Sequence, residues 1–414
     1  MARRQSSQEH DPSRREFFKT FSRQTIQQAG AVAGAAAELR RTSLNAAREL
    51  LDMDAPTATE APTASRVVGP PSEASAPQET FRSAYRFTVT SVVVLDQREL
   101  PGRVITFECH EPNDVASAIR SGAITPGPVL GQVAAYGVAL GAVVATERAD
   151  DSRDRFVRTS ADGIKSGRGE VAAVRHAVTR MMDRYNELAN GNASGTEARD
   201  ALVAEADAIA EQATAACAEI GRAWSDLVVG DPINLLVHGD NGPLSCGMVG
   251  MATSGIQRLI EEGRRVHVWV TDGAPTGEGT RVAAVQLSQL DIPHTVIPDS
   301  AVGWLMASRT IDALVLRGDT VATNGDTVAL LGARAVAQLA ADAHVPVHVL
   351  APETSWDRTR RDASELVLDL RSAAELGSAT SARLNPPFDI VPARLVSAYV
   401  SERAVARPPF KEPR

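Results

Sequence analysis

Two stretches of sequence decide the fold, Leu235-Leu236-Val237-His238-Gly239-Asp240-Asn241-Gly242 and Leu314-Val315-Leu316-Arg317-Gly318-Asp319-Thr320. Each is an apolar run followed by small and acidic residues. In an open parallel sheet, the carboxyl ends of the strands deliver polar groups into a crevice. Two such stretches in one domain therefore mark a candidate ligand site.

The same pattern continues on both sides of these stretches. After Gly230, short β-rich runs alternate with helical segments, which is typical of βαβ units and a doubly wound parallel sheet. The expected strands are Ile233 to Val237, Val266 to Val270, His294 to Ile297, Ala313 to Leu316 and Val345 to Leu350. We therefore predict a Rossmann-like α/β domain over residues 230–414, although neither a G-x-G-x-x-G nor a Walker spacing is present.

A smaller domain is predicted before it, over residues 81–229, with a few β-strands and mainly helices. Alternating β-branched residues indicate one strand over 87–95 and another over 104–109. Apolar residues at helical spacing indicate helices over 114–120, 129–146, 171–188 and 198–227.

The first 80 residues have a different composition. Residues 54–80 are rich in Ala, Pro, Thr, Ser and Glu, which predicts a disordered linker. Residues 1–53 form an N-terminal extension that we expect to be helical. Ser13-Arg14-Arg15-Glu16-Phe17-Phe18-Lys19 fits a twin-arginine export signature, but Arg23, Gln24, Gln27 and Gln28 interrupt the apolar core such a signal needs. A cytoplasmic protein is the favoured interpretation, with export as the alternative.

Composition excludes some functions. The chain has 414 residues and a formal charge of −8, which argues against a nucleic-acid surface. No run approaches a transmembrane length. The three cysteines, Cys109, Cys217 and Cys246, match no metal or redox spacing and are expected to be reduced thiols. We predict neither a metal nor a cofactor, and a small molecule as the partner.

An ordered set of motifs covers about three quarters of the chain and resembles the methylthioribose-1-phosphate isomerases. The wider group includes ribose-1,5-bisphosphate isomerase and the regulatory subunits of initiation factor 2B, so the resemblance indicates the fold better than the function. The motifs are Leu95-Asp96-Gln97-Arg98-Glu99-Leu100-Pro101, Ala118-Ile119-Arg120, Ala134-Ala135-Tyr136-Gly137, Arg317-Gly318-Asp319, Asn324-Gly325-Asp326 and Asn385-Pro386-Pro387-Phe388-Asp389-Ile390-Val391-Pro392-Ala393.

The resemblance implies a homodimer that converts an aldose 1-phosphate into a ketose 1-phosphate. Such chemistry needs a phosphate cradle, an acid/base carboxylate and, in these enzymes, a cysteine beside it. Asp319 matches the family's catalytic aspartate. The substrate-binding candidates are His238, Gly239, Asn241, Gly242, Arg168, Asn324 and Asp326; Arg281 and Asp299 also match the pattern.

The departures from the family fall where the chemistry is expected. Gly239 stands at the cysteine position and Asp240 at the asparagine that follows it. Thr125 and Ala274 stand where the family has two arginines. Ala329-Leu330 stands where the family has an Asn-Lys pair, close to the helix start that we expect at the Asn-Gly-Asp motif. Because each charge-assisted hydrogen bond to a phosphate contributes about 1.5 to 3 kcal/mol, losing three cations predicts much weaker binding of a phosphorylated substrate.

Three functions remain open. In the first, the protein isomerises a less anionic sugar or polyol, and Asp240 and Asp319 form an acid/base pair whose pKa values are pushed apart. Asp240 could instead only cap the helix that begins near Pro243, and Cys246 could be a reactive thiol or a buried packing residue. In the second, the protein is a non-catalytic ligand sensor or assembly subunit. In the third, the family's own isomerase activity survives.

Overall fold

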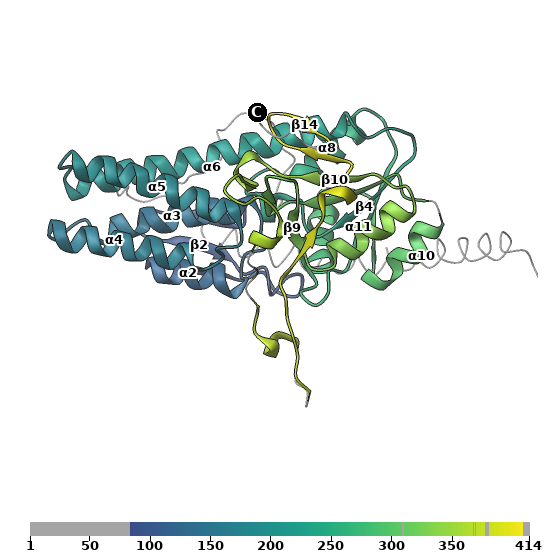
Figure 1. Ribbon diagram of the computed structural model, residues 1–414. Helices are drawn as coiled ribbons and strands as arrows, with labels where there is room; N and C mark the ends of the chain where they lie inside the picture. The colour runs from purple at the N-terminus through teal and green to yellow at the C-terminus, as the bar shows by residue number, and fades with distance from the viewer. Residues whose placement is uncertain (1–82, 309, 367, 369, 377–380, 409–414) are drawn as a thin grey trace, which may run out of the picture. The chain divides into compact units, whose positions relative to one another are not determined.

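The computed structural model describes residues 83–308, 310–366, 368, 370–376 and 381–408 (Figure 1). Within them it confirms the predicted fold class, a doubly wound parallel sheet preceded by a mainly helical region with a few strands. The predictions for residues 1–53 and 54–80 lie outside the described residues. No helix in the described ranges is long and apolar enough to cross a bilayer.

The main sheet has seven strands in the order β14-β13-β10-β7-β4-β5-β6. Every neighbouring pair is parallel except β13 with β14, which is antiparallel. The strands are β4 (Ile233–His238), β5 (Val266–Thr271), β6 (His294–Ile297), β7 (Ala313–Arg317), β10 (Val347–Leu350), β13 (Ala398–Val400) and β14 (Val405–Ala406). The chain leaves β4 toward β5 on one side and later returns to place β7 on the other. The strand order therefore reverses between β4 and β7, which is where ligands bind in such sheets.

Both faces of this sheet are covered. Along β4, Leu235 and Val237 face one apolar cluster and Leu236 faces another, because successive side chains of a strand point to opposite sides. The first cluster includes residues of α8 (Met251–Glu261), α9 (Ala284–Gln289) and the end of α6. The second includes residues of α10 (Val302–Ala307) and α11 (Ala333–Asp342). Burial on both faces explains why β4 and β7 read as continuous apolar runs.

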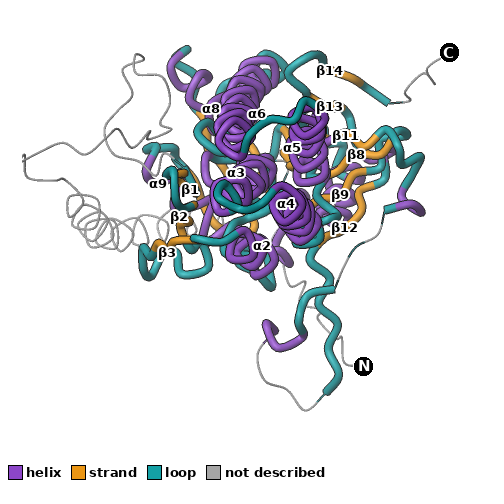
Figure 2. The backbone as a smooth tube through the Cα atoms, turned by 90° about the vertical axis from the view of Figure 1, so that its left-hand side faces the viewer, coloured by secondary structure: helices purple, strands orange, loops and turns teal. Residues whose placement is uncertain are grey.

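From residue 83 onward, five helices precede the sheet. Figure 2 looks along them nearly end-on. They are α2 (Pro112–Ser121), α3 (Pro128–Val144), α4 (Asp150–Lys165), α5 (Ala172–Asn190) and α6 (Gly195–Ser225). The central helix α3 is buried along almost its whole length. The sequence pattern did not indicate α4, most of whose residues are charged or polar, although Val157, Ala161 and Ile164 are buried.

A three-stranded antiparallel sheet lies beside these helices, with β1 (Tyr85–Phe87), β2 (Val92–Leu95) and β3 (Thr106–Cys109). The single strand predicted over 87–95 is wrong, because the chain turns within it. The Thr88 hydroxyl accepts a hydrogen bond from the Ser91 N–H at 2.9 Å, and the Thr88 N–H donates to the Ser91 carbonyl at 2.8 Å. These two polar residues close a hairpin inside a stretch that otherwise has strand composition.

A second small sheet, in the order β11-β8-β9-β12, carries the chain away from the end of β7. Its strands are β8 (Thr320–Ala322), β9 (Thr327–Leu330), β11 (Trp356–Asp357) and β12 (Phe388–Val391). The helix start expected at the Asn324-Gly325-Asp326 motif is wrong, because the motif forms the turn of the β8–β9 hairpin. The Asn324 side chain accepts the Asp326 N–H at 2.9 Å, and Gly325 takes φ +95°.

Candidate active site

The carboxyl ends of β4 and β7 bring the two deciding stretches together. The strands are adjacent and parallel, with His238 paired to Leu316. The segment 239–242 after β4 and the segment 317–319 at the end of β7 therefore meet at one edge of the sheet. A short helix, α7 (Pro243–Cys246), begins directly after the first segment, as expected from the sequence.

Arg317 is the centre of the site. Its Nε donates to Asp319 Oδ1 at 2.9 Å, and its Nη1 donates to Glu278 Oε1 at 3.0 Å and to the carbonyl of Asp240. Its side chain is only 2% exposed. Burial opposes the charge, but Asp319 and Glu278 outweigh it and raise the pKa of Arg317. A permanently charged guanidinium thus links both predicted catalytic residues.

Asp319 is completely enclosed. Its side chain is 0% exposed and is held by the Arg317 guanidinium through both carboxylate oxygens. Burial raises the pKa of Asp319 even though Arg317 acts in the opposite direction, with Glu278 and Glu170 adding to the rise. A buried carboxyl group with a raised pKa and a specific charged partner is typical of residues that exchange protons in active sites.

Asp240 has a structural contact on one oxygen and none on the other. Its Oδ1 accepts the Gly242 N–H at 3.1 Å and the Gln286 amide at 2.8 Å. The first contact closes a turn before α7, whose N-cap residue is Gly242 and which has no side-chain cap, so the expected capping by Asp240 is not formed. Its Oδ2 is buried and accepts no hydrogen bond from the described residues. Burial, with Glu278 adding to it, raises the pKa of Asp240, and Arg317 opposes this rise. The pKa values of Asp240 and Asp319 are thus shifted in the same direction and not apart.

Asn241 lies beside Asp240 and is 2% exposed. Neither its side-chain oxygen nor its side-chain nitrogen has a partner among the described residues. Buried amides are almost always hydrogen-bonded. The pair of Asp240 Oδ2 and the Asn241 amide therefore offers one carboxyl oxygen, one amide donor and one amide acceptor to a ligand.

Two further residues of the site, Glu278 and Gln286, were missed in the sequence. Glu278 Oε1 accepts the Asp240 N–H at 2.7 Å as well as the Arg317 contact, and Gln286 Oε1 accepts the Leu244 N–H at 2.7 Å. Both follow β5, the strand beside β4, whose carboxyl end lies at the same edge of the sheet. The rule that ligands bind at the carboxyl ends of parallel strands could have indicated this region of the sequence. It does not say which residues of the segment between β5 and β6 turn toward the site.

His238 and Gly239 are held by the scaffold. His238 Nε2 lies 3.0 Å from the Leu331 carbonyl, which can only accept, so Nδ1 accepts from the Thr271 hydroxyl at 2.8 Å. Burial lowers the pKa of His238, which keeps the ring neutral. Gly239 takes φ +85°, a conformation that side chains disfavour, and a Cβ there would lie 3.5 Å from Leu330 Cδ2.

Arg168 reaches the same cluster from the helical region. Its Nη1 lies 3.3 Å from Glu170 Oε1, and both side chains are buried. Glu170 is tied to the site through its carbonyl, which accepts the Thr320 hydroxyl at 2.7 Å, directly after Asp319. The six residues Arg168, Glu170, Asp240, Glu278, Arg317 and Asp319, called the buried cluster below, therefore contain four carboxyl groups and two guanidinium groups, none more than 9% exposed.

Asn324 and Asp326 do not join the buried cluster. Asn324 is exposed, and its amide donates to Asp326 Oδ2 at 3.0 Å. Asp326 accepts the N–H groups of Ala363 and Ala393, both at 3.0 Å. These hydrogen bonds hold the segments around Ala363 and Ala393 against the β8–β9 turn. The Asn324-Gly325-Asp326 motif therefore has a structural role here.

Cys246 is fully buried, and the Cys217 thiol lies 3.9 Å from its carbonyl. Its neighbour Ser245 donates to the Asp240 carbonyl at 3.1 Å. This packing between α6 and α7 agrees with the interpretation of Cys246 as a buried small residue.

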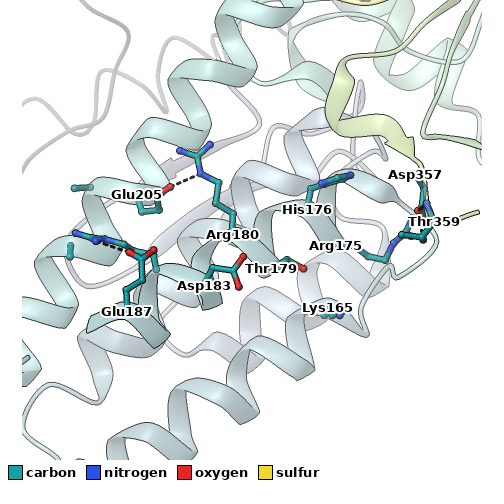
Figure 3. Close-up of a pocket in the computed structure, with 13 residues that line it drawn as sticks. Lys165, Arg175, His176, Thr179, Arg180, Asp183, Glu187, Glu205, Asp357 and Thr359 are labelled. Carbon is teal, nitrogen blue, oxygen red and sulfur yellow. Dashed lines mark hydrogen bonds and ion pairs between the residues drawn. The ribbon is translucent and has the colours of Figure 1, made fainter. Parts of the chain in front are cut away.

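A cavity of about 890 Å³ lies elsewhere, between α5, α6 and the segment after β11 (Figure 3). None of the predicted site residues lines it. Arg175, His176, Asp357 and Thr359 lie at one end, and Arg180 and Glu205 form an ion pair toward the other. Its side chains carry charges of both signs, and we assign it no ligand.

The fold and the site define a class of protein, an α/β protein with a buried acidic site at the switch point of a parallel sheet. The chain belongs to the initiation factor 2 subunit family, whose model matches residues 127–408. It is similar to the methylthioribose-1-phosphate isomerase of Herpetosiphon aurantiacus, with 31% identity over 77% of this chain and 91% of that protein. The methylthioribose-1-phosphate isomerase of Caldicellulosiruptor saccharolyticus is also 31% identical, over 79% of this chain and 97% of that protein.

Solved structures show the same fold. The 5-methylthioribose 1-phosphate isomerase from Pyrococcus horikoshii superimposes with a TM-score of 0.70 at 23% identity, covering 80% of this chain and 93% of that one. The delta subunit of translation initiation factor 2B from A. fulgidus gives a TM-score of 0.64 at 24% identity, covering 79% and 96%. The predicted fold is therefore confirmed by these structures, and the predicted family by the family model and the curated relatives.

Proposed function

We propose that this protein is a sugar isomerase of the aldose-to-ketose type whose substrate differs from methylthioribose 1-phosphate. The curated relatives named as methylthioribose-1-phosphate isomerases support an isomerase-like function. The observation that carries the proposal is that two buried carboxyl groups, those of Asp240 and Asp319, lie around Arg317, which binds the Asp319 carboxylate and the main-chain carbonyl of Asp240.

Their environment suits acid/base chemistry. Burial raises the pKa of both groups, so each keeps a proton at a higher pH than a free carboxyl does. A carboxyl that titrates closer to neutrality can give a proton to the ring oxygen as a sugar opens and take one back as hydrogen moves from C2 to C1. The net reaction consumes no proton. Arg317 would stabilise whichever carboxyl is ionised at a given step.

The altered substrate rests on the departures from the family pattern. Gly239 supplies no side chain where the family pattern has a cysteine, and its left-handed backbone disfavours one. Leu330, which stands where the family pattern has a lysine, packs beside Gly239. The groups nearest to Gly239 are Glu278 Oε1 and Leu330, and neither can donate a hydrogen bond to a phosphate. The four carboxyl groups of the buried cluster also outnumber its two guanidinium groups, which disfavours a dianion.

The test is an NMR assay of the full chain with methylthioribose 1-phosphate, ribose 1-phosphate, ribose 1,5-bisphosphate and unphosphorylated aldoses. We expect no turnover of methylthioribose 1-phosphate within the usual range of about 1 to 1,000 per second. We expect a ketose product from another member of the panel. Asp319→Asn keeps the shape but cannot exchange a proton, so it should lower that rate by about 100-fold or more. Efficient turnover of methylthioribose 1-phosphate would overturn the altered substrate, and an active Asp319→Asn would remove Asp319 from the mechanism.

A second candidate is a non-catalytic protein that senses a ligand or supports an assembly. The observation that favours it is the two-point contact between Arg317 and Asp319. Because both oxygens of the expected catalytic carboxylate accept hydrogen bonds from Arg317, this carboxylate is held as part of an ion pair. A compound that raises the melting temperature of the protein but is recovered unchanged would support this function. The cytoplasmic location and the homodimer are also proposals, and light scattering of the purified chain tests the dimer.

A further inference from the structure

Two adjacent side chains in the region of the buried cluster point to a ligand. Asp240 and Asn241 are 1% and 2% exposed, and Asp240 Oδ2 and both polar atoms of the Asn241 amide have no partner among the described residues. The other polar atoms around them are satisfied by Gln286, Glu278 and Arg317. Buried polar atoms rarely stay without hydrogen bonds. A ligand that reaches them is expected to supply what is missing.

The charge around Asp240 indicates which ligand fits. The charged and polar groups that face it come from the elements packed there. They are Glu278 before α9, Gln286 on α9, Arg317 on β7, and Ser245 and Cys246 on α7. The buried cluster has two more carboxyl groups than guanidinium groups, and Arg317 is already shared by Asp319 and Glu278. A cation relieves this excess, whereas a phosphate increases it.

Building on the proposed function, we propose that the ligand of this site is an amino sugar, with its ammonium group bound by Asp240 Oδ2 and a neighbouring hydroxyl bound by the Asn241 amide. A neutral sugar could satisfy the amide equally well. Only the ammonium also balances the charge of the buried cluster, and it donates a charge-assisted hydrogen bond to the free carboxylate oxygen.

The proposal includes a defined proton balance. Because burial raises the pKa of Asp240, a fraction of the free protein holds a proton on this carboxyl. The ammonium ion binds the ionised form, so the carboxyl plus R–NH₃⁺ gives a carboxylate–ammonium pair and releases up to one proton to solvent. A hydroxyl group in the same place would release none.

Calorimetry of the full chain tests this with glucosamine, galactosamine and mannosamine, each beside its hydroxyl and N-acetyl counterparts. The titrations use PIPES and HEPES, whose different ionisation enthalpies reveal proton release. We expect at least one amino sugar to bind about 10 to 100 times more tightly than its counterparts, with proton release. Asp240→Asn should abolish both the preference and the release, while Asp151→Asn, which changes an exposed carboxyl of α4, should keep both.

Equal binding of the amino, hydroxyl and N-acetyl forms would overturn the proposal, as would no binding by any amino sugar or an unchanged preference in Asp240→Asn. The outcome is separate from that of the proposed function. Amino sugars that bind with proton release but give no ketose leave this inference standing and count against isomerase activity. Turnover of neutral sugars without any preference for the amine would support isomerase activity and overturn this inference.

Discussion

The buried cluster and the open cavity on α5 and α6 each contain an Arg–Glu ion pair of the same length in different surroundings. Arg317 and Glu278 lie 3.0 Å apart with side chains 2% and 4% exposed, and Arg184 and Glu187 lie 3.0 Å apart with side chains 42% and 68% exposed. Distance alone therefore does not distinguish them. Water screens the exposed pair and can replace either partner, whereas neither member of the buried pair can be removed without leaving a charge in a dry interior.

The largest expected effect is that of Arg317→Met, which leaves Asp319 and Glu278 buried without their cation. We expect a loss of about 3 to 5 kcal/mol of unfolding free energy at neutral pH. The loss should shrink as the pH falls, because protonation neutralises the stranded carboxyl groups. Denaturant titration at several pH values measures it, and a loss below about 1 kcal/mol at neutral pH would show that water reaches the cluster.

Asp240→Asn is expected to have the next largest effect, with a pH dependence of known sign. The folded-state pKa of Asp240 lies above its ordinary value of 3.8, so its contribution to stability is full below that value and is lost as the pH rises through the folded-state pKa. The asparagine carries no buried charge at high pH. Its stability relative to wild type should therefore increase with pH, reaching about 1 to 3 kcal/mol.

The matched control for that series is Asp151→Asn, whose carboxyl is exposed on α4. Its stability relative to wild type should stay flat across the same pH range. An Asp240→Asn difference that is equally flat would contradict the raised pKa.

A smaller effect is expected from Gly239→Cys, which places a cysteine where the family pattern has one. Because Gly239 takes φ +85°, any L-residue there should cost about 1 to 2 kcal/mol. Gly239→Ala should cost nearly as much, since the strain lies in the backbone. Melting curves of both variants check this, and a cysteine variant as stable as wild type would show that the backbone adjusts.

The smallest effect is expected from Arg184→Met, at the exposed pair. Its change in unfolding free energy should be within about 0.5 kcal/mol. Denaturant titration beside Arg317→Met gives the direct comparison. A larger loss would indicate that the cavity on α5 and α6 is built around this ion pair.

Sequence reasoning placed Asp240 and Asp319 at the crevice edge of the sheet, because an apolar run followed by small and acidic residues indicates the carboxyl end of a strand. The expected catalytic role of Asp319 came from the resemblance to the family. Sequence reasoning did not identify Arg317 as the centre of the site, although Arg317 belongs to one of the quoted stretches. No sequence pattern tells whether the guanidinium of an arginine at the end of a buried strand points into the site or toward solvent. Sequence reasoning also left out Glu278 and Gln286, which follow β5 and turn inward only after it.

The sequence by itself determined the family, the alternation of strands and helices and the crevice end of the sheet, because these depend on local periodicity and on motifs in a fixed order. Only the tertiary structure decided how the acidic residues are used. It placed Asn324 and Asp326 in a hairpin turn. Both ring nitrogens of His238 form hydrogen bonds within the fold, to the Thr271 hydroxyl and the Leu331 carbonyl. Four carboxyl groups are buried together with two guanidinium groups. The physical reason is that burial and charge pairing depend on residues far apart in the chain, which meet only when the sheet and its helices are assembled.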